Sequence, residues 1–308
     1  MTARRLDGSA TAREIRDRVA LGVAALQRDT GVTPGLTVVM VGEHPASLSY
    51  VRGKEKAARE AGMRSAIVRL PGDTGEARVL AAVEALNADP KVHGILVQLP
   101  LPADVDSRRV IEAIDPAKDV DGFHPLNAGR LLIGLPGVVP CTPAGVIALL
   151  KRHAIPLAGQ RAVVLGRSDI VGKPLAVLLL RENCTVTIAH SRTSDVAAVA
   201  SEADVLIAAI GKPGLVDASF IKPGATVVDV GIHSLTDEAT VRRLFGGDDA
   251  KLRALRERGS VLCGDVHPVD GAGRAGWLSP VPGGVGPMTI ALLLANTLEA
   301  ARGCSASA

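Results

Sequence analysis

The sequence predicts an α/β protein with two α/β domains, the second a Rossmann-like doubly wound parallel sheet. The first observation is a series of apolar runs of strand length between stretches of helical spacing, which is typical of parallel strands covered on both faces. These runs are 36–41, 66–70, 94–97, 162–165, 185–188, 205–209 and 226–230. The second is the length of 308 residues, which suits two domains. The third is a Pro- and Gly-rich passage between Ile114 and Pro143, where the alternation stops.

That passage sets the domain boundaries. We expect residues 1–140 together with 286–308 to form one domain, and residues 141–285 to form the other. The second Gly-rich passage, before residue 288, leads into an apolar helix over 288–300 that should pack on the first domain. The small polar tail 302–308 should fray.

Local signals mark the ends of two further helices. A charged, Ala-rich helix over 46–61 should end at Gly62, because glycine readily adopts the left-handed conformation that closes a helix. Pro174 lies in the first helical turn after a glycine loop, where a missing N–H costs no hydrogen bond.

Composition narrows the possible functions. The 35 Lys and Arg nearly balance the 32 Asp and Glu, and this scattered net charge of +3 predicts no nucleic-acid or membrane partner. Aromatic residues make up 2% of the chain, so the core must be aliphatic. The four cysteines form no C-x-x-C pair, which favours reduced thiols and predicts no metal site. We expect no signal peptide or membrane span, and hence a cytoplasmic protein.

A glycine loop, G-R-S-D-I-V-G-K-P at 166–174, connects a predicted strand to an apolar helix. Backbone N–H groups at such a helix start bind phosphates. The loop is neither a Walker A loop nor G-x-G-x-x-G, and a mere tight turn is the alternative.

The next strand ends in A-H-S-R-T at 189–193, without the carboxylate that holds the ribose of NAD. Ser191 and Arg192, with Arg167, offer a hydroxyl and two guanidinium groups for the additional phosphate of NADP. The alternative is a solvated arginine at a strand end, and the glycine loop favours the phosphate.

Four polar residues in the first domain are candidates for chemistry. Tyr50 and Lys54 are four apart on one helical face. They precede the glycine loop, which argues against a short-chain dehydrogenase, and a surface lysine in a charged helix is the alternative. Gln98 ends the strand G-I-L-V-Q, and Asp121 lies in the loop K-D-V-D-G-F. Strand ends of open α/β sheets are where ligands bind.

Seven ordered segments resemble the bifunctional methylenetetrahydrofolate dehydrogenase and methenyltetrahydrofolate cyclohydrolase family. They are P-A-S-L-S-Y-V-R-G-K, V-Q-L-P-L-P, D-V-D-G-F-H-P-L-N, P-C-T-P-A-G, G-R-S-D-I-V-G-K-P, K-P-G-A-T-V-V-D-V-G-I and P-G-G-V-G-P-M-T. The resemblance implies a folate in a cleft between the domains, NADP as hydride acceptor, and a homodimer formed through the second domain. It implies oxidation of the methylene bridge, then hydrolysis to 10-formyltetrahydrofolate.

The resemblance also assigns roles to residues. It matches Lys54 to the catalytic lysine, Gln98 to the glutamine beside it, Tyr50 to the folate-stacking tyrosine and Asp121 to the pterin-binding aspartate. The cofactor contacts that it implies, with Arg192 from the strand-end argument, are Gly166, Arg167, Ser168, Ser191, Arg192 and Ile232. The loop expected to edge the folate pocket contributes Gly283, Gly284 and Pro287.

The chain departs from the family pattern at three places. Asp169 stands where Asn is usual, and His267-Pro268 replaces the usual D-F. The segment 235–260 is longer than expected, and its charge density predicts a solvated helical excursion that tolerates shortening. The alternatives to a bifunctional folate enzyme are another NADP-dependent oxidoreductase and a non-catalytic nucleotide-binding regulator, and the regulator leaves the Tyr50, Lys54, Gln98 and Asp121 set unexplained.

Overall fold

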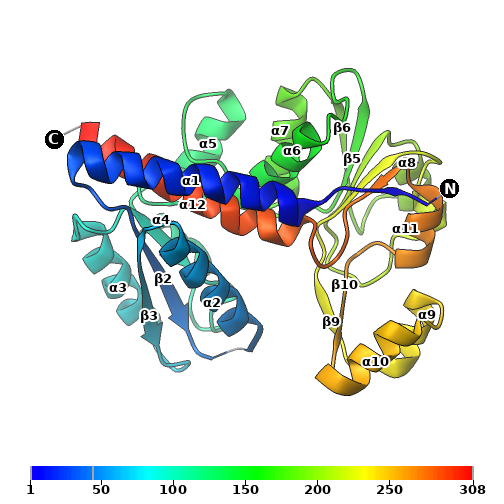
Figure 1. The fold of residues 1–308 in the computed structure, drawn as a ribbon, viewed down its shortest axis with the longest axis horizontal. Coiled ribbons are helices and arrows are strands. Elements are labelled where there is room, and N and C mark those ends of the chain that lie inside the picture. Colours follow the sequence, from blue (N-terminus) through cyan, green and yellow to red (C-terminus); the bar gives the residue numbers. More distant parts are fainter. Residues whose placement is uncertain (1, 44, 307–308) are drawn as a thin grey trace. The chain divides into compact units, whose positions relative to one another are not determined.

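The computed structural model describes residues 2–43 and 45–306 and divides into two compact units (Figure 1). Within the described residues, unit 1 comprises the chain up to Thr11 together with Thr142–Met288. Unit 2 comprises Ala12–Cys141 and the chain from Thr289 onward. The division falls within two long helices, α1 (Gly8–Thr30) and α12 (Val285–Ala306).

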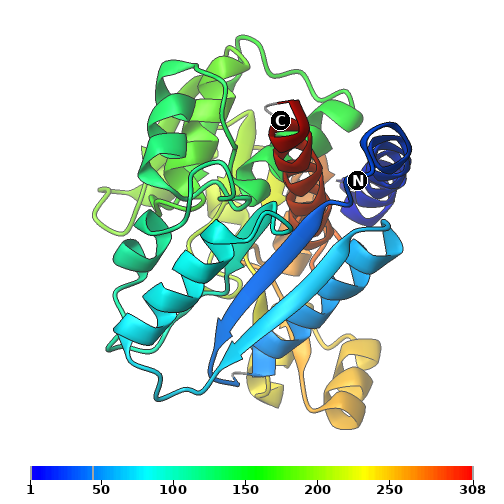
Figure 2. The ribbon, with the colours of Figure 1, turned by 90° about the vertical axis from the view of Figure 1, so that its left-hand side faces the viewer.

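Unit 2 is built on a three-stranded parallel sheet in the order β3-β2-β4 (Figure 2). All seven residues of the central strand β2 are buried, which is why its sequence is a continuous apolar run. The strands are β2 (Gly35–Val41), β3 (Arg64–Leu70) and β4 (Gly94–Val97). The helices within this unit are α2 (Pro45–Glu60), α3 (Glu76–Ala88), α4 (Ser107–Glu112) and α5 (Pro125–Ile133).

Helix α12 contributes to unit 2 as the sequence predicts. Gly22 of α1 lies against Leu298, and Gly53 of α2 lies near Ile290, so small residues let both helices approach α12. The described part of the tail continues this helix to Ala306, and fraying of residues 302–308 stays a prediction.

Unit 1 contains a six-stranded, wholly parallel sheet in the order β1-β11-β8-β7-β5-β6. The chain adds β6 on one side of β5 and then β7 on the other, so the edge between β5 and β7 is a topological switch point, where such sheets bind ligands. The strands are β1 (Arg4–Arg5), β5 (Arg161–Leu165), β6 (Thr185–Ala189), β7 (Val205–Ala208), β8 (Thr226–Asp229) and β11 (Trp277–Leu278). The helices are α6 (Cys141–Arg152), α7 (Gly172–Arg181), α8 (Val196–Ser201) and α11 (Pro268–Arg274), with a 3₁₀ turn over Ala218–Phe220.

The first strand joins the sheet of unit 1, although the sequence analysis groups residues 1–140 in the other domain. β1 pairs with β11, and Arg4 lies over the ring of Trp277 at 5.4 Å. The backbone N–H of Asp7 donates to His153 Nε2 at 3.1 Å. A two-residue strand carries no periodic signal, so only long-range pairing assigns it.

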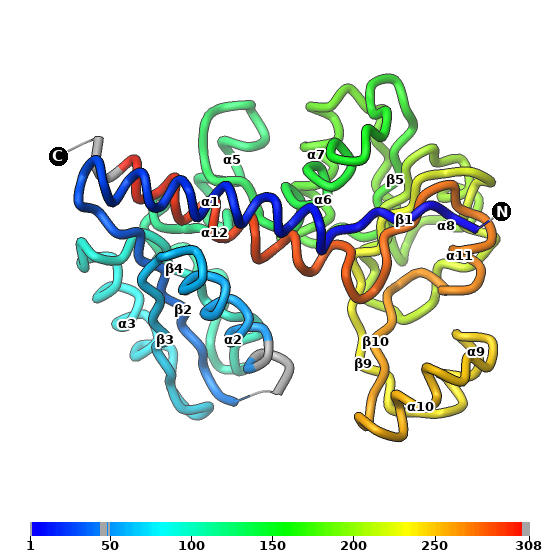
Figure 3. The backbone as a smooth tube through the Cα atoms, in the orientation of Figure 1, coloured from blue at the N-terminus to red at the C-terminus, as the bar shows by residue number. Residues whose placement is uncertain are grey.

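The segment 233–263 forms a small module of its own in unit 1 (Figure 3). Its antiparallel strands β9 (His233–Leu235) and β10 (Val261–Cys263) bracket α9 (Glu238–Phe245) and α10 (Asp249–Arg258). The expectation of a solvated helical segment is confirmed, because most of residues 236–260 are exposed, but the expectation that it tolerates shortening does not fit the core that it encloses. Its two helices and two strands enclose a buried core of Leu235, Val241, Leu244, Leu252, Leu255, Val261 and Cys263. Removing part of the module would expose that core.

The core and the cysteines of the described chain can be compared with what the composition predicts. Phe220 is the one aromatic side chain among the buried apolar residues of the described chain, so its core is aliphatic as expected. Cys141, Cys184 and Cys263 are free and buried, whereas the side chain of Cys304 lies outside the described part. In the described residues, no helix has the length and hydropathy needed to cross a membrane.

Candidate active site

Lys54 and Gln98, 44 residues apart in sequence, are hydrogen-bonded in unit 2. The side chain of Lys54 projects from α2, and its Nζ donates to Gln98 Oε1 at 3.0 Å. Gln98 follows β4, and its Nε2 donates to the carbonyl of Leu99 at 2.8 Å, which turns the amide oxygen toward the lysine. Lys54 is only 8% exposed, so the surface-lysine alternative is wrong.

Tyr50 lies one turn before Lys54 on the same helix. Its side chain is 37% exposed, and partial burial raises the pKa of its hydroxyl. The phenol is therefore neutral at physiological pH and presents an open apolar surface.

Asp121 lies within electrostatic range of Lys54. Burial raises the pKa of the Asp121 carboxyl to about 6, while the Lys54 ammonium opposes the shift and Asp119 adds to it. The group is ionised at neutral pH but titrates within the range in which an enzyme operates. Lys54 is thus hydrogen-bonded to Gln98 and interacts electrostatically with Asp121, and the roles that the sequence analysis gives to these three residues stay predictions.

Asp119, which the sequence analysis did not single out, holds the loop that presents Asp121. It is 1% exposed, and its carboxylate accepts the backbone N–H groups of Gly122, Phe123 and His124. A fourth donor is Asn127 Nδ2, at 2.9 Å. The D-x-x-G spacing of an Asx turn was the available signal, because a short carboxylate readily accepts N–H groups a few residues on.

Asn296 of α12 supports the same loop from the other end of the sequence. Its Nδ2 donates to the carbonyls of Val120 and Val139, at 2.9 and 3.1 Å. It also approaches the sulfur of Cys141, whose thiol donates to the carbonyl of Val120. Burial raises the pKa of this thiol, so Cys141 is a neutral structural group. No local pattern predicts the long-range pairing of Asn296.

The glycine loop of unit 1 is tightly closed against its own sheet. Gly166 has φ of +119°, and a Cβ there would lie 2.1 Å from the carbonyl oxygen of Ala209. A Cβ on Gly172 would lie 2.3 Å from the carbonyl oxygen of Gly166. Ser168 Oγ accepts the N–H groups of Val171 and Gly172, both at 3.2 Å. Both glycines are therefore structurally required, and the loop places the start of α7 at the sheet edge.

The glycine loop, with Arg167, and the loop after β6, with Ser191 and Arg192, present the polar groups expected for a phosphate. Arg167, Ser191 and Arg192 are all exposed, and residues 189–193 include no carboxylate. The turn is fixed by Thr193 Oγ1, which accepts the N–H of His190, and by His190 Nδ1, which accepts that of Arg192. Asp169, the departure in the glycine loop, forms an ion pair with Lys173 one turn along α7. Its negative charge is therefore compensated.

A pocket of 230 Å³ opens at the switch point, among the ends of β5, β7 and β8. It brings together two expected cofactor contacts, Ser168 and Ile232. The other lining residues are Ile170, Val171, Ala209, Gly211, Val230, Gly231, His233 and Asp265. Gly211 and Gly231 in the lining, and the start of α7 beside it, fit a dinucleotide, because backbone N–H groups can approach its phosphates closely where no side chain intervenes.

The Pro- and Gly-rich loop before α12 belongs to unit 1. Gly283 has φ of +103°, and its carbonyl accepts the N–H of Ser9 at 3.0 Å. A Cβ on Gly284 would lie 2.7 Å from the carbonyl oxygen of Pro280. Packing within the chain thus explains both glycines, and a role of Gly283, Gly284 and Pro287 toward substrate stays a prediction.

The other departure, His267-Pro268, begins α11. His267 is the N-cap, with Nδ1 accepting the N–H of Asp270, and Pro268 occupies the first turn. Both residues thus have a local structural role.

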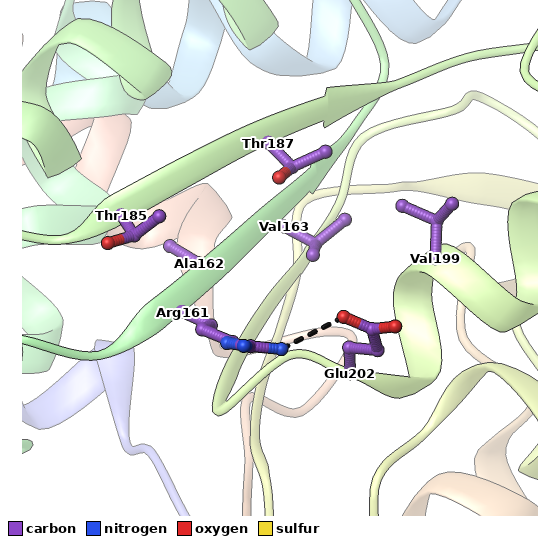
Figure 4. Close-up of a pocket in the computed structure, with 7 residues that line it drawn as sticks. All are labelled: Arg161, Ala162, Val163, Thr185, Thr187, Val199 and Glu202. Atoms are coloured by element: carbon purple, nitrogen blue, oxygen red, sulfur yellow. Dashed lines mark hydrogen bonds and ion pairs between the residues drawn. The ribbon is translucent and has the colours of Figure 1, made fainter.

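A second cavity, of 280 Å³, lies over β5, β6 and α8 and contains none of the expected site residues (Figure 4). Thr185 and Thr187 line it from the edge strand, and an ion pair joins Arg161 to Glu202 across its floor. Among the described residues, no group of three His, Cys, Asp or Glu side chains is arranged to hold a metal ion.

The fold and sites define a two-domain α/β enzyme with a Rossmann-like nucleotide-binding domain. Residues 140–305 match the family model of the tetrahydrofolate dehydrogenase/cyclohydrolase NAD(P)-binding domain. Residues 6–121 match that of the tetrahydrofolate dehydrogenase/cyclohydrolase catalytic domain. The chain therefore belongs to the tetrahydrofolate dehydrogenase/cyclohydrolase family.

Individual relatives are similar in sequence to this chain over almost its full length. The bifunctional protein FolD of Koribacter versatilis is 52% identical, covering 98% of each chain. That of Cereibacter sphaeroides is 54% identical, covering 97% of this chain and 95% of the relative. Among solved structures, FolD of Campylobacter jejuni superposes with a TM-score of 0.88 at 39% identity, covering 98% of this chain and 99% of that one. The Trypanosoma brucei enzyme, complexed with NADP and an inhibitor, gives 0.89 at 38% identity, covering 98% of each.

Proposed function

We propose that this protein oxidises 5,10-methylenetetrahydrofolate to 5,10-methenyltetrahydrofolate with NADP, and then hydrolyses the product to 10-formyltetrahydrofolate. The observation that carries the proposal is the partly buried Lys54–Gln98 hydrogen bond beside Asp121. An amine, an amide and a carboxylate converge there on elements of the family's catalytic domain.

Hydration of the methenyl cation and opening of the ring require protons to be moved near the bridge carbon. Lys54 is the group that gives and takes them, because the residue is 8% exposed and its Nζ is held in one position by the amide oxygen of Gln98. Gln98 orients Lys54, since its own amide N–H is engaged with the carbonyl of Leu99.

Tyr50 and Asp121 in unit 2 bind the folate. The Asp121 carboxylate accepts hydrogen bonds from the donor edge of the pterin, and it is ionised above a pH of about 6. The neutral, partly exposed ring of Tyr50 supplies a stacking surface.

The cofactor is held by unit 1. Gly166 and Ser168 shape the phosphate loop, Ile232 lines the pocket, and Arg167, Ser191 and Arg192 bind the 2′-phosphate that distinguishes NADP from NAD. When bound, NADP supplies the hydride acceptor for the oxidation.

The test is Lys54→Met assayed for both activities on one purified sample. Methenyl hydrolysis, corrected for the spontaneous reaction, should fall about 100-fold to 10,000-fold, the usual contribution of a general acid–base group. Methenyl formation should survive, because hydride transfer moves no proton to a protein side chain. The matched control is Lys56→Met, since Lys56 lies on the same helix but its side chain is 78% exposed.

Three outcomes of this experiment argue against parts of the proposal. Equal loss of both activities would assign Lys54 to substrate positioning. Full retention of both would remove it from the chemistry. A wild-type protein that forms no methenyl product from methylenetetrahydrofolate and NADP would overturn the proposed function itself.

We also propose a cytoplasmic homodimer formed through the nucleotide-binding domain, working in the folate pathways that serve purine, methionine and histidine synthesis. In support, β6 is an edge strand with exposed Thr185 and Thr187 and with Ile188 40% exposed. Ile188→Glu should halve the mass measured by light scattering. Leu215→Glu, at a similarly exposed apolar residue of the same unit, should not.

A further inference from the structure

His233 forms a partly buried hydrogen-bonded pair with Asp265 in the pocket at the switch point. The ring Nε2 lies 2.7 Å from Asp265 Oδ1. The aspartate is fully buried, whereas the histidine side chain is 20% exposed. His233 is the first residue of β9 and lies opposite Cys263, two residues before Asp265, so the strand register brings the two side chains together.

The hydrogen bonds of Asp265 fix which ring nitrogen carries a hydrogen. Its Oδ2 accepts the N–H groups of Ile210 and Gly211, and its Oδ1 accepts that of Lys212. A carboxylate with three obligate backbone donors is an acceptor only. His233 must therefore donate through Nε2–H, which leaves Nδ1 as the ring position that gains or loses a proton.

Among the residues that line this pocket, His233 is the one whose charge can change, whereas Asp229 titrates behind the lining and is present in the wild type and in the His233 variants alike. Of the lining residues, His233 and Asp265 have ionisable side chains. Behind them, Asp229 accepts the N–H of Asp265, and burial raises its pKa to about 7. Burial raises the pKa of the neighbouring Cys263 thiol to about 11, so it stays neutral. The nearest basic side chain along the 210–212 loop, Lys212, is exposed, and Asp169 on the glycine loop is paired with Lys173.

We infer that His233 is a proton-linked contact for the dinucleotide: its imidazole takes up a proton at Nδ1 when the phosphate-bearing cofactor binds. With Nδ1 neutral, the pair with Asp265 has a net charge of −1, and with Nδ1 protonated its net charge is zero. An anionic ligand favours the second state, so binding raises the proton affinity of His233. By reciprocity, lower pH tightens binding. This inference rests on the proposed function, because it takes the pocket to hold NADP.

The experiment is calorimetric titration of the protein with NADP at pH 7 in two buffers of different ionisation enthalpy, which counts the protons taken up. The wild type should take up a fraction of a proton for each NADP bound, because binding of the anion raises the proton affinity of the ring. The dissociation constant should therefore rise between pH 6 and pH 8, by no more than the factor by which binding raises that proton affinity.

Two variants make the measurement specific. His233→Gln keeps an N–H donor for Asp265 but cannot titrate, so it should bind NADP without this uptake, and His233→Asn is the second variant should the first not fold. His124→Gln, in unit 2, should behave as the wild type. Titration of the cofactor's own 2′-phosphate contributes equally to all four proteins and cancels in the comparison.

The outcomes separate this inference from the proposed function. Uptake that is lost only in the His233 variants supports it. Equal uptake in wild type and His233→Gln, or none in either, overturns it while leaving NADP binding intact. Absence of any NADP binding by the wild type would overturn the proposed function, and the inference with it.

Discussion

Asp119 in unit 2 and Asp265 in unit 1 are both buried carboxylates that accept three successive backbone N–H groups. Asp119 accepts the N–H groups of residues 122–124, and Asp265 accepts the N–H groups of residues 210–212. They differ in the fourth donor, which is the amide of Asn127 in one and the imidazole of His233 in the other. An amide never titrates in the physiological range, whereas an imidazole does. The same arrangement thus has an amide as its fourth donor beside Asp121 and an imidazole, for which we infer proton linkage, beside the nucleotide pocket.

The largest effect should come from removing the fixed carboxylate. Asp119→Ala removes the side-chain acceptor of three backbone N–H groups and of the Asn127 amide, all buried or partly buried, and each buried group left unsatisfied costs about 1–3 kcal/mol. We expect at least about 3 kcal/mol of lost stability in urea unfolding, with loss of both activities. Asp106→Ala, at an exposed N-cap, should cost about 1 kcal/mol. A similar cost for the two variants would show that Asp119 does not hold its loop.

The exposed arginines of unit 1 should have the next largest effect. Charge-assisted hydrogen bonds contribute about 1.5–3 kcal/mol, or roughly 10-fold to 100-fold in affinity per contact. Arg192→Ala and Arg167→Ala should therefore weaken NADP by that factor and NAD by much less, measured as dissociation constants. Arg181→Ala, at the far end of α7, is the control. Equal weakening of NADP and NAD would place the arginines on the shared diphosphate.

Acid should weaken folate binding through unit 2, opposite to its effect on the nucleotide. Asp121 loses its charge as pH falls through about 6, so the KM for methylenetetrahydrofolate should rise about tenfold from pH 7 to pH 5. Asp121→Asn should have a higher KM that varies less with pH. A wild-type KM that is constant across this range would remove Asp121 from substrate binding.

The smallest effect should come from His93, a buried histidine outside both sites. Its Nδ1 accepts the N–H of Gly35 at the start of β2, and burial, with Arg64 and Lys118, lowers its pKa. Since the unfolded chain binds this proton more readily, the contribution is complete above pH 6.5 and is lost as pH falls below it. Loss of this hydrogen bond should cost on the order of 1 kcal/mol. The difference in unfolding free energy between pH 7.5 and 5.5 should shrink in His93→Gln.

The sequence by itself determined the elements whose signals are local. The sequence of strand β2 is a continuous apolar run because both faces of a central parallel strand are covered. The helix over 45–60 ends before Gly62 because glycine readily adopts the φ of +80° that it has there. The glycine loop and the missing carboxylate after β6 are equally local. Local patterns also marked Lys54, Gln98 and Asp121 as candidates, but their roles came from the family resemblance, because no spacing in this chain indicates that they act together.

Tertiary structure alone decided what depends on contacts between distant residues. Nothing near Asp119 in sequence indicates that Asn296 secures the same loop, and nothing near His233 indicates a partner 32 residues on. The core of the 233–263 module escaped prediction because its apolar residues are dispersed among charges, and only the pairing of β9 with β10 brings them together. Local sequence patterns indicate which side chains of a helix or strand are buried. Which other residue a buried side chain contacts depends on the chain topology, because hydrogen bonds and packing form between residues that are close in space, however far apart they are in the sequence.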